Sequence, residues 1–285
     1  MKVVITGSGG YIGKELICRL QPEGFDCIPV KREFWDGRVE KISELLAGTD
    51  VVINLAGAPI LKRWTKKNRD EIYRSRVLLT QKLVSAIYLL PETKRPKTFI
   101  TASAIGIYKN GLTHDETSIE FDNGFLGKLV QDWELASSTL PDDVRRVVFR
   151  IGLVLGNQSK TLTSMVPIFK FGLGGKISDG KQSFPFIHID DLVSAFVWAI
   201  KNKEIRDVFN LVVPNPITNK QFTIQLAKKL KRPALFTVPA FILKILFGEA
   251  SQLIIQSPEV FPKKLLEKGF TFTKPTIEES LGDIG

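Results

Sequence analysis

Histidine and cysteine are scarce in this chain. Among 285 residues only His114 and His188 are histidines, and only Cys18 and Cys27 are cysteines. Two histidines are too few for a histidine-rich metal site and leave few candidate bases for a Ser/His/Asp triad. The cysteines show no metal-ligand spacing, and we expect both to be buried thiols. The composition therefore argues against a bound metal and against hydrolase chemistry.

Long hydrophobic runs are also missing. The most apolar stretch, residues 234–248, is too short to cross a bilayer and contains Pro239 and Lys244. It is better interpreted as an interior helix or as a helix that faces the second subunit of a homodimer. Residues 1–6 run directly into a strand pattern and then into glycines, so we expect no signal peptide and a cytoplasmic location.

The chain carries an excess of positive charge without a nucleic-acid motif. The formal net charge is +10, and basic residues concentrate at positions 62–76. They are not interleaved with aromatic residues and form no finger-like pattern. We therefore expect a solvated basic helix face and no nucleic-acid partner.

Strand and helix patterns alternate along the first half of the chain. Alternation of this kind predicts parallel strands joined by helices, a doubly wound α/β sheet of the Rossmann type. Beyond residue 150, Gly and Pro become frequent and strands are short, which predicts a dinucleotide-binding domain at 1–150 and a smaller C-terminal substrate-binding lobe at 151–285. The helix expected at 191–201 would pack back on the sheet. The predicted strands are 2–6, 26–30, 50–55, 97–101 and 145–150, and the predicted helices are 11–20, 39–46, 68–90, 125–138, 191–201, 219–231 and 239–247.

A glycine-rich turn joins the first strand to the first helix. Gly7 makes the tight turn, Gly10 allows close approach of a pyrophosphate, and Gly13 allows close packing of helix on strand. The start of the helix adds free N–H groups and a positive dipole end. A glycine-rich turn without a ligand is the alternative. The residues expected at the cofactor phosphates are Gly7, Ser8, Gly9, Gly10, Tyr11, Ile12 and Gly13.

Basic residues follow the second strand, where an NAD-selective site usually has an acidic residue. Lys31 and Arg32 come first, and Glu33 only afterwards. A guanidinium suits bidentate contact with a 2′-phosphate, so the sequence favours NADP over NAD as cofactor. A solvated Lys-Arg pair is the alternative interpretation.

Several segments together resemble the extended short-chain dehydrogenases/reductases. They are the glycine turn, Asn54–Gly57, Ser103, Arg150–Gly152 and Ile187–Asp191, in that order. More narrowly, the whole chain resembles the atypical, epimerase-like subfamily (NAD-dependent epimerase/dehydratase, sugar-nucleotide epimerase-like) that ends in a domain of unknown function. This resemblance implies that Ala56 and Gly57 run past the adenosine and ribose, and that Ser103 faces the nicotinamide. Leu55 and Arg150 are further cofactor contacts expected from it.

The Tyr/Lys pair of ordinary short-chain dehydrogenases is absent. In that family a tyrosine exchanges the proton, and a lysine four residues later lowers the phenol pKa. No YxxxK occurs in this chain, and Phe125 and Leu129 fill the expected positions. As replacements we consider Ser103 as a hydrogen-bond donor and Tyr108 as an acid with an accessible phenol. A packed aromatic residue is the alternative for Tyr108.

Four residues are candidates for substrate binding. Trp64 and Arg76 would offer a stacking surface and a guanidinium to an anionic ligand such as a nucleotide sugar. Gln182 and His188 would lie at the rim of the same pocket. The alternatives are that Trp64 covers the helix that begins near Asn68, and that His188 is a structural histidine at a helix start.

Two functions remain open at this level. The first is an NADP-dependent oxidoreductase or nucleotide-sugar epimerase that relies on positioning, with acid/base work done by Ser103, Tyr108 or water. The second is a sensor or regulatory protein that binds NADPH without turning it over.

Overall fold

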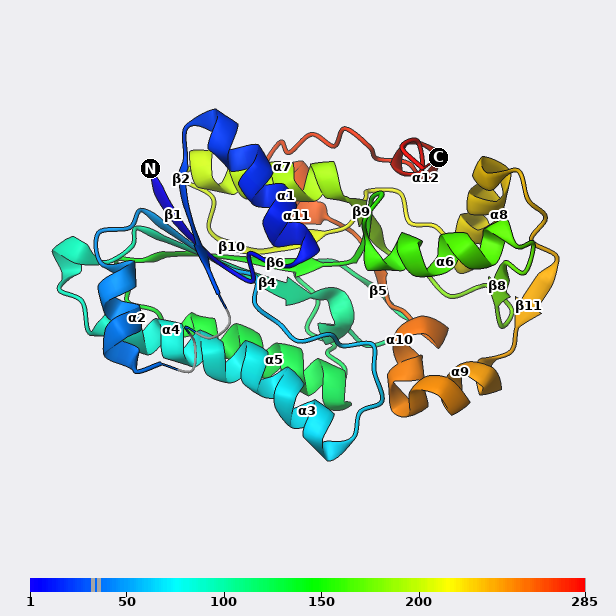
Figure 1. The fold of residues 1–285 in the computed structure, drawn as a ribbon, viewed down its shortest axis with the longest axis horizontal. Coiled ribbons are helices and arrows are strands. Elements are labelled where there is room, and N and C mark those ends of the chain that lie inside the picture. The colour runs from blue at the N-terminus through cyan, green and yellow to red at the C-terminus, as the bar shows by residue number, and fades with distance from the viewer. Residues whose placement is uncertain (32–33, 35–36, 285) are drawn as a thin grey trace.

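A sheet of six parallel strands forms the centre of the molecule (Figure 1). The computed structural model describes residues 1–31, 34 and 37–284. The strand order is β10-β6-β4-β3-β1-β2. β2 therefore lies on one side of β1, and the later strands lie on its other side. The predicted doubly wound Rossmann-type fold is confirmed. The strands are β1 (Lys2–Thr6), β2 (Asp26–Val30), β3 (Val51–Asn54), β4 (Thr98–Ala104), β6 (Arg145–Ile151) and β10 (Asp207–Leu211).

Helices cover both faces of this sheet because successive strand side chains point to opposite sides. Val3 and Ile5 of β1 belong to the core beneath α1 and α7, whereas Val4 belongs to the core beneath α2 and α4. Strands buried on both faces need apolar residues at every position, which explains the continuous apolar runs of the sequence. The helices are α1 (Tyr11–Leu20) and α7 (Ile189–Lys201) on one face, and α2 (Val39–Leu46), α4 (Leu79–Tyr88) and α5 (Phe125–Ser138) on the other (Figure 1).

The long helix expected at 68–90 is interrupted. It consists of α3 (Lys66–Tyr73), a π-helical turn at Arg74–Leu78 and α4. Thr65 caps the start of α3, where its side chain accepts a hydrogen bond from the Asn68 amide. π-Helical turns inside α-helices often mark functional sites, and this one carries Arg76.

A second group of elements lies beyond the carboxyl ends of β4 and β6 (Figure 1). The region following residue 151 does not stay apart from the sheet, because α7 and β10 return to it. The domain boundary at residue 150 stays a prediction. The elements of this lobe that concern the site are α6 (Lys160–Lys170), β8 (Gly175–Ile177), β9 (Phe186–His188), α8 (Asn219–Leu230), β11 (Phe236–Val238), α9 (Ala240–Phe247) and α10 (Gln252–Ile255).

The remaining elements are short. β7 pairs with β9, and β5 pairs with β12 across a large separation in sequence. Across the described part of the chain, no helix is long and apolar enough to cross a membrane. The expectation of two buried cysteines is wrong, because Cys18 is exposed on α1 and Cys27 is half-buried. These short elements are β5 (Thr113–His114), β7 (Leu153–Leu155), β12 (Glu259–Val260), α11 (Lys263–Glu267) and α12 (Ile277–Ser280).

Candidate cofactor and substrate site

The glycine turn between β1 and α1 is packed too closely for any side chain at two of its positions. Gly7 has φ +68°, and a Cβ there would lie 2.7 Å from the carbonyl carbon of Leu55. A Cβ on Gly13 would lie 2.5 Å from the Gly7 carbonyl oxygen. Real Cβ atoms do not approach backbone so closely, so glycine is required at both positions for steric reasons. The turn brings the start of α1 directly against the end of β1 and the loop after β3.

The N-terminus of α1 is open to an anion. Gly10 is its N-cap residue, no side chain among the described residues caps it, and its first turn has no acidic residue. The free N–H groups of a first helical turn favour a negatively charged group. The tight glycine turn and the uncapped start of α1 together fit a dinucleotide pyrophosphate.

The other residues predicted at this turn surround the helix start. The Ser8 hydroxyl is 3.4 Å from the Val30 carbonyl oxygen at the end of β2, a long hydrogen bond. Gly9 is exposed, and Ile12 borders the cavity described below. The Tyr11 hydroxyl oxygen lies against Gly156. Burial, and then the charges of Glu15 and Asp190, raise the pKa of Tyr11 to about 12. Tyr11 is therefore a neutral phenol at physiological pH.

A buried polar cluster fixes the loop after β3. The Thr6 hydroxyl donates to Asn54 Oδ1 at 2.8 Å and accepts from the backbone amides of Leu55 and Ala56, both at 3.1 Å. Asn54 Nδ2 in turn donates to Thr80 Oγ1 at 2.9 Å. This cluster positions Leu55, Ala56 and the following Gly57 beside the glycine turn.

The residues predicted to select NADP lie only partly within the described structure. Lys31 directly follows β2 and is exposed. Arg32 lies outside the described residues. The selection of NADP by the Lys31-Arg32 pair therefore stays a prediction.

A cavity of about 1230 Å³ opens beyond the carboxyl ends of β4 and β6. One side is formed by the sheet and its helices, including Ser103, Trp133 and Arg76, and the other by the C-terminal lobe. Trp64 and Gln182 also line it. Substrate binding by these two residues stays a prediction. Ligands of open α/β sheets bind at this end of the strands, so the cavity is the candidate substrate site.

Ser103 is joined to a buried ion pair. Its hydroxyl donates to Glu134 Oε1 at 2.5 Å, and Arg150 donates to the same carboxylate through Nε at 2.8 Å and Nη2 at 2.7 Å. Because the Ser103 hydroxyl donates its hydrogen bond to Glu134, the Ser103 oxygen remains able to accept a hydrogen bond from a ligand. Donation from Ser103 to a ligand, the role expected from the sequence, requires that Glu134 return a proton to Ser103, and it stays a prediction.

Tyr108 and Arg150 are occupied within the protein. The Tyr108 side chain is 1% exposed, its hydroxyl accepts from Arg150 Nη1 at 2.8 Å, and it lies 2.9 Å from Asn210 Oδ1. Burial raises the pKa of Tyr108. Burial alone would lower the pKa of Arg150, but the hydrogen bonds and charge of Glu134 raise it. The expectation of an accessible phenol at Tyr108 is therefore wrong. The Arg150 guanidinium is engaged by Glu134 and Tyr108, and the cofactor contact expected of Arg150 stays a prediction.

The Arg76 side chain is half-buried, and it forms no ion pair with any acidic side chain of the described residues. Its guanidinium packs against the backbone of Gly57, where a Cβ would lie 2.8 Å from Cζ, and over the Trp133 ring at 5.4 Å. Nη1 has no hydrogen-bond partner among the described residues. Burial lowers the pKa of Arg76 to about 10. A guanidinium whose buried Nη1 has no partner beside a cavity is suited to an anionic ligand.

Trp64 and Gln182 have structural contacts as well as a place in the cavity wall. The Trp64 indole donates to the Ile60 carbonyl at 3.0 Å and packs edge-on against Phe125 at 5.0 Å. The Gln182 amide donates to the Ile177 carbonyl at 3.2 Å. Phe125 and Leu129, which replace the family's Tyr/Lys pair, also line the cavity. The wall near Ser103 is therefore apolar where an acid/base pair would normally stand.

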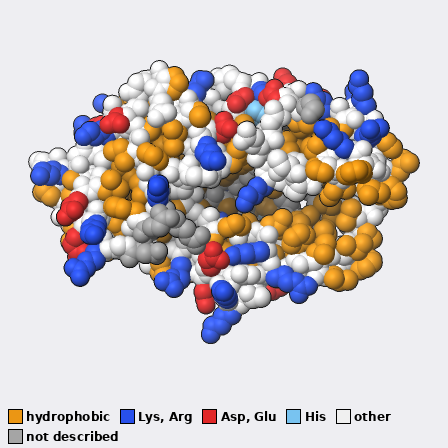
Figure 2. Space-filling model, viewed as in Figure 1, with side chains coloured by type: hydrophobic (Ala, Val, Ile, Leu, Met, Phe, Trp, Pro, Cys, Tyr) orange, Lys and Arg blue, Asp and Glu red, His pale blue; other side chains and the backbone are white. Residues whose placement is uncertain are grey.

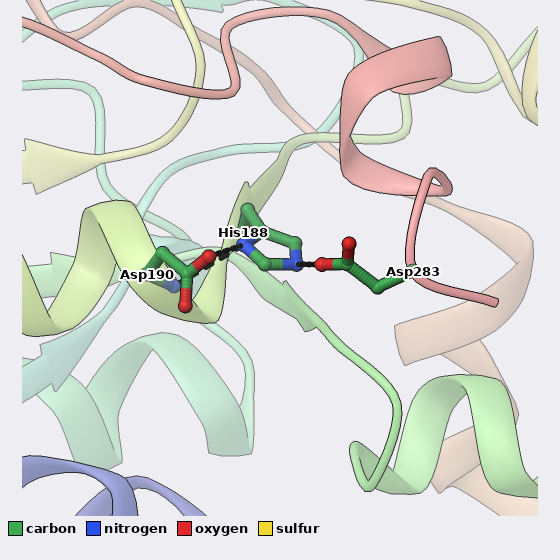
Figure 3. A group of neighbouring side chains, drawn as sticks. All are labelled: His188, Asp190 and Asp283. Atoms are coloured by element: carbon green, nitrogen blue, oxygen red, sulfur yellow. Dashed lines mark hydrogen bonds and ion pairs between the residues drawn. The ribbon is translucent and has the colours of Figure 1, made fainter.

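His188 does not border the cavity. It is 1% exposed and caps α7, where Nδ1 accepts from the Asp190 amide at 3.2 Å (Figure 3). Nε2 points toward the Asp283 carboxylate at 3.6 Å. The expectation that His188 contacts substrate is therefore not supported, and the structural alternative at a helix start is the one observed.

His188 forms a cluster with two carboxylates, one of them from the C-terminal segment. His188, Asp190 and Asp283 each offer an atom within 4.8 Å of the others. The Lys274 ammonium lies between the two carboxylates, 3.2 Å from Asp190, and forms an ion pair with Asp283. This ammonium already supplies the positive charge that the carboxylates attract.

We expect the fold to lose stability below about pH 6.5 because of His188. Burial lowers the pKa of His188 in the folded chain. Below the ordinary histidine pKa, the unfolded chain therefore binds a proton at His188 that the folded chain does not bind. Because the unfolded chain then binds more protons, the free energy of unfolding decreases as pH falls. Asparagine also caps helices, so His188→Asn should reduce the difference in melting temperature between pH 7.5 and pH 5.5. An unchanged difference in the variant would contradict this role.

With the site in view, the chain can be assigned to a family. It belongs to the NAD-dependent epimerase/dehydratase family, whose sequence model matches residues 3–211, and a domain of unknown function (DUF1731) matches residues 238–284. The resemblance inferred from the sequence is thereby confirmed.

Relatives cover the whole chain. The mouse epimerase family protein SDR39U1 is 34% identical over 100% of this chain and 99% of its own length. The crystal structure of human SDR39U1 (isoform 2) with NADPH has a TM-score of 0.92 and 30% identity, covering 100% of this chain and 99% of that chain. A nucleoside-diphosphate sugar epimerase from Corynebacterium glutamicum has a TM-score of 0.78 and 29% identity, covering 99% of this chain and 57% of that chain.

Proposed function

We propose that this chain binds NADP(H) and catalyses hydride transfer as an oxidoreductase. The observation that carries the proposal is the glycine turn, where Gly7 and Gly13 leave no room for a side chain and the start of α1 is uncapped. The presence of NADPH in the structure of human SDR39U1 supports the same cofactor.

The residues that would hold the cofactor follow from their positions. The amides of Ser8, Gly9, Tyr11 and Ile12 would face the pyrophosphate, with Gly10 permitting close approach. Leu55, Ala56 and Gly57 would run along the ribose, and Ser103 would mark the nicotinamide end. Lys31 and Arg32 would contact the 2′-phosphate.

When bound, this cofactor supplies or accepts the hydride. The accompanying proton is assigned to Ser103 and Glu134, since the Tyr/Lys pair is replaced by Phe125 and Leu129. During oxidation of an alcohol, the Ser103 oxygen accepts the hydroxyl proton while its own proton passes to Glu134, 2.5 Å away. Reduction of a carbonyl reverses both transfers. Tyr108 and Arg150 position Glu134 and do not touch the reacting atoms.

Substitution of Arg32 tests the choice of cofactor. Arg32→Ala should weaken NADPH binding by about tenfold or more and leave NADH binding nearly unchanged, because only NADPH carries the 2′-phosphate. Titration of both dinucleotides into wild-type and variant protein measures this. Equal weakening of the two would show that Arg32 does not contact the 2′-phosphate.

Turnover separates the enzyme from a sensor. The protein is incubated with NADPH and candidate carbonyl compounds, or with NADP⁺ and candidate nucleotide sugars. Nicotinamide absorbance and product epimers are followed. Oxidation of NADPH supports the oxidoreductase, and interconversion of sugar epimers without net oxidation of the sugar supports an epimerase. Tight binding without either reaction supports the alternative, a regulatory protein that senses NADPH. A homodimer and a cytoplasmic location stay predictions.

A further inference from the structure

We propose that the substrate is an amphipathic molecule with a long apolar chain, such as an acyl or isoprenoid alcohol, aldehyde or ketone, rather than a nucleotide sugar. This inference rests on the proposed function, because it assigns the substrate class of the same site. It is carried by the chemistry of the cavity wall and of the surface around it.

The far wall of the cavity is apolar. Opposite Ser103 it is formed by Met165 and Phe169 from α6, Leu243 from α9, and Leu253 and Ile254 from α10. A sugar ring and a pyrophosphate would leave many hydroxyl and phosphate oxygens without hydrogen-bond donors against such a wall, at considerable cost in free energy. A hydrocarbon chain gains free energy by being buried there.

Several polar side chains of this wall are hydrogen-bonded within the protein, whereas the buried Ser183 hydroxyl has no partner among the described residues. The Thr163 hydroxyl donates to the Ser159 carbonyl at 2.9 Å, and the Ser164 hydroxyl donates to the Lys160 carbonyl. Asn219 Oδ1 accepts from the Ile177 amide at 2.8 Å. These groups therefore offer less to a sugar than their number in the lining suggests.

Polar groups suited to a reacting end lie on the opposite side of the cavity. Ser103 has an oxygen able to accept, and Arg76 has a buried Nη1 without a partner among the described residues. The cavity thus has a polar end at the sheet and an apolar end in the C-terminal lobe. An amphipathic molecule with its oxygen toward Ser103 and its chain toward α9 matches both.

The apolar wall continues onto the outside of the molecule. Ile168 and Leu173 line the cavity and are also exposed. Beside them, α9 is apolar on nearly all sides, with Phe241 62% and Ile245 63% exposed. Figure 2 shows hydrophobic side chains gathered at the α9 and β11 end of the molecule, around a hollow. A contiguous exposed apolar surface marks a binding region, and here it borders the mouth through which an apolar chain would enter.

Contacts from the dinucleotide-binding half hold α9 over the cavity. Arg63 donates to the carbonyls of Ile245 and Leu246 at the end of α9, and Arg69 forms an ion pair with Glu249 just beyond it. A cation at the C-terminus of a helix is favourable because the helix dipole is negative there. The helix is thus held by its end, and its apolar side chains remain available to a ligand.

Binding of a fluorescent fatty acid tests this proposal. cis-Parinaric acid is titrated into the full chain, and displacement is attempted with dodecanol and with UDP-glucose. We expect saturable binding that dodecanol reverses and UDP-glucose does not. The absence of saturable binding, or displacement by UDP-glucose alone, would overturn the proposal.

A matched pair of variants locates the bound chain. Ile168 lines the cavity and Ile224 on α8 does not, yet both are helical and both are 51% exposed. Ile168→Glu should weaken the binding of cis-parinaric acid by about tenfold, because the substitution places a charge beside the hydrocarbon chain of the ligand. Ile224→Glu should leave that affinity unchanged. Equal affinities of the two variants for cis-parinaric acid would show that the fatty acid binds elsewhere, and would overturn the proposal.

NADPH titration of the same variants separates this inference from the proposed function. Both variants should bind NADPH as the wild type does, because neither position contacts the glycine turn. If the wild-type chain binds the fatty acid as expected but not NADPH, the proposed function fails, and the apolar molecule stands as a ligand of the cavity but not as a substrate. If it binds NADPH but not the fatty acid, only the substrate class fails.

Discussion

Gly13→Ala is expected to weaken NADPH binding by at least about 100-fold, or ~2.7 kcal/mol. The added Cβ would lie 2.5 Å from the Gly7 carbonyl oxygen and 2.8 Å from Ser8 Cα. Both are backbone atoms, so the start of α1 must move away from the turn. This displacement takes the helix N–H groups away from the pyrophosphate. Titration of NADPH into the purified variant, followed by nicotinamide fluorescence, measures the loss.

A control is needed because Gly13→Ala also strains the fold. Gly24 has φ +83°, and a Cβ there would meet nothing within 4 Å. Gly24→Ala should therefore cost about 1–2 kcal/mol of stability through backbone strain alone while NADPH affinity is retained. If the two variants lost NADPH affinity equally, the loss at Gly13 would reflect general destabilisation.

Glu134→Ala is expected to lower the free energy of unfolding by about 3–5 kcal/mol, the usual cost of leaving a buried charge unpaired. The Arg150 side chain is only 6% exposed. The Glu134 carboxylate accepts two hydrogen bonds from Arg150 and one from Ser103. Urea denaturation of wild type and variant measures the difference. Replacement of both Glu134 and Arg150 by methionine should recover much of the loss, because no isolated charge then remains.

An exposed ion pair provides the comparison. Asp143 pairs with Arg95 at 2.8 Å, and their side chains are 29% and 20% exposed. Water solvates a charge left at such a site, so Asp143→Ala should cost only about 0–1 kcal/mol. If Glu134→Ala cost no more than Asp143→Ala, the network that joins Ser103 to Arg150 would not be the buried unit described above.

Local sequence patterns predicted the part of the fold that depends on local signals. The strand at 2–6, the helix at 11–20 and the helix at 125–138 have the predicted bounds, because hydrophobic periodicity and glycine punctuation set them directly. The helix α6 was not predicted, since Pro167 lies inside it and the surrounding glycines suggest loops. The π-helical turn at Arg74–Leu78 leaves no recognisable signal in the sequence either.

The site was less predictable because its groups pair across the fold. Nothing in the local sequence indicates that Glu134 bonds both Ser103 and Arg150. Tyr108 lies after a strand end, where an accessible phenol is plausible, yet the pairing of Tyr108 with Arg150 and Asn210 depends on residues 42 and 102 positions away. Only the tertiary structure brings these together.

Calorimetric titration of the unmodified chain with NADPH tests the central claim most directly. A helix start aimed at a dinucleotide phosphate predicts saturable binding of one NADPH per chain, with NADH binding more weakly. Heat no greater than that of dilution, for NADPH and for NADH alike, would contradict the account.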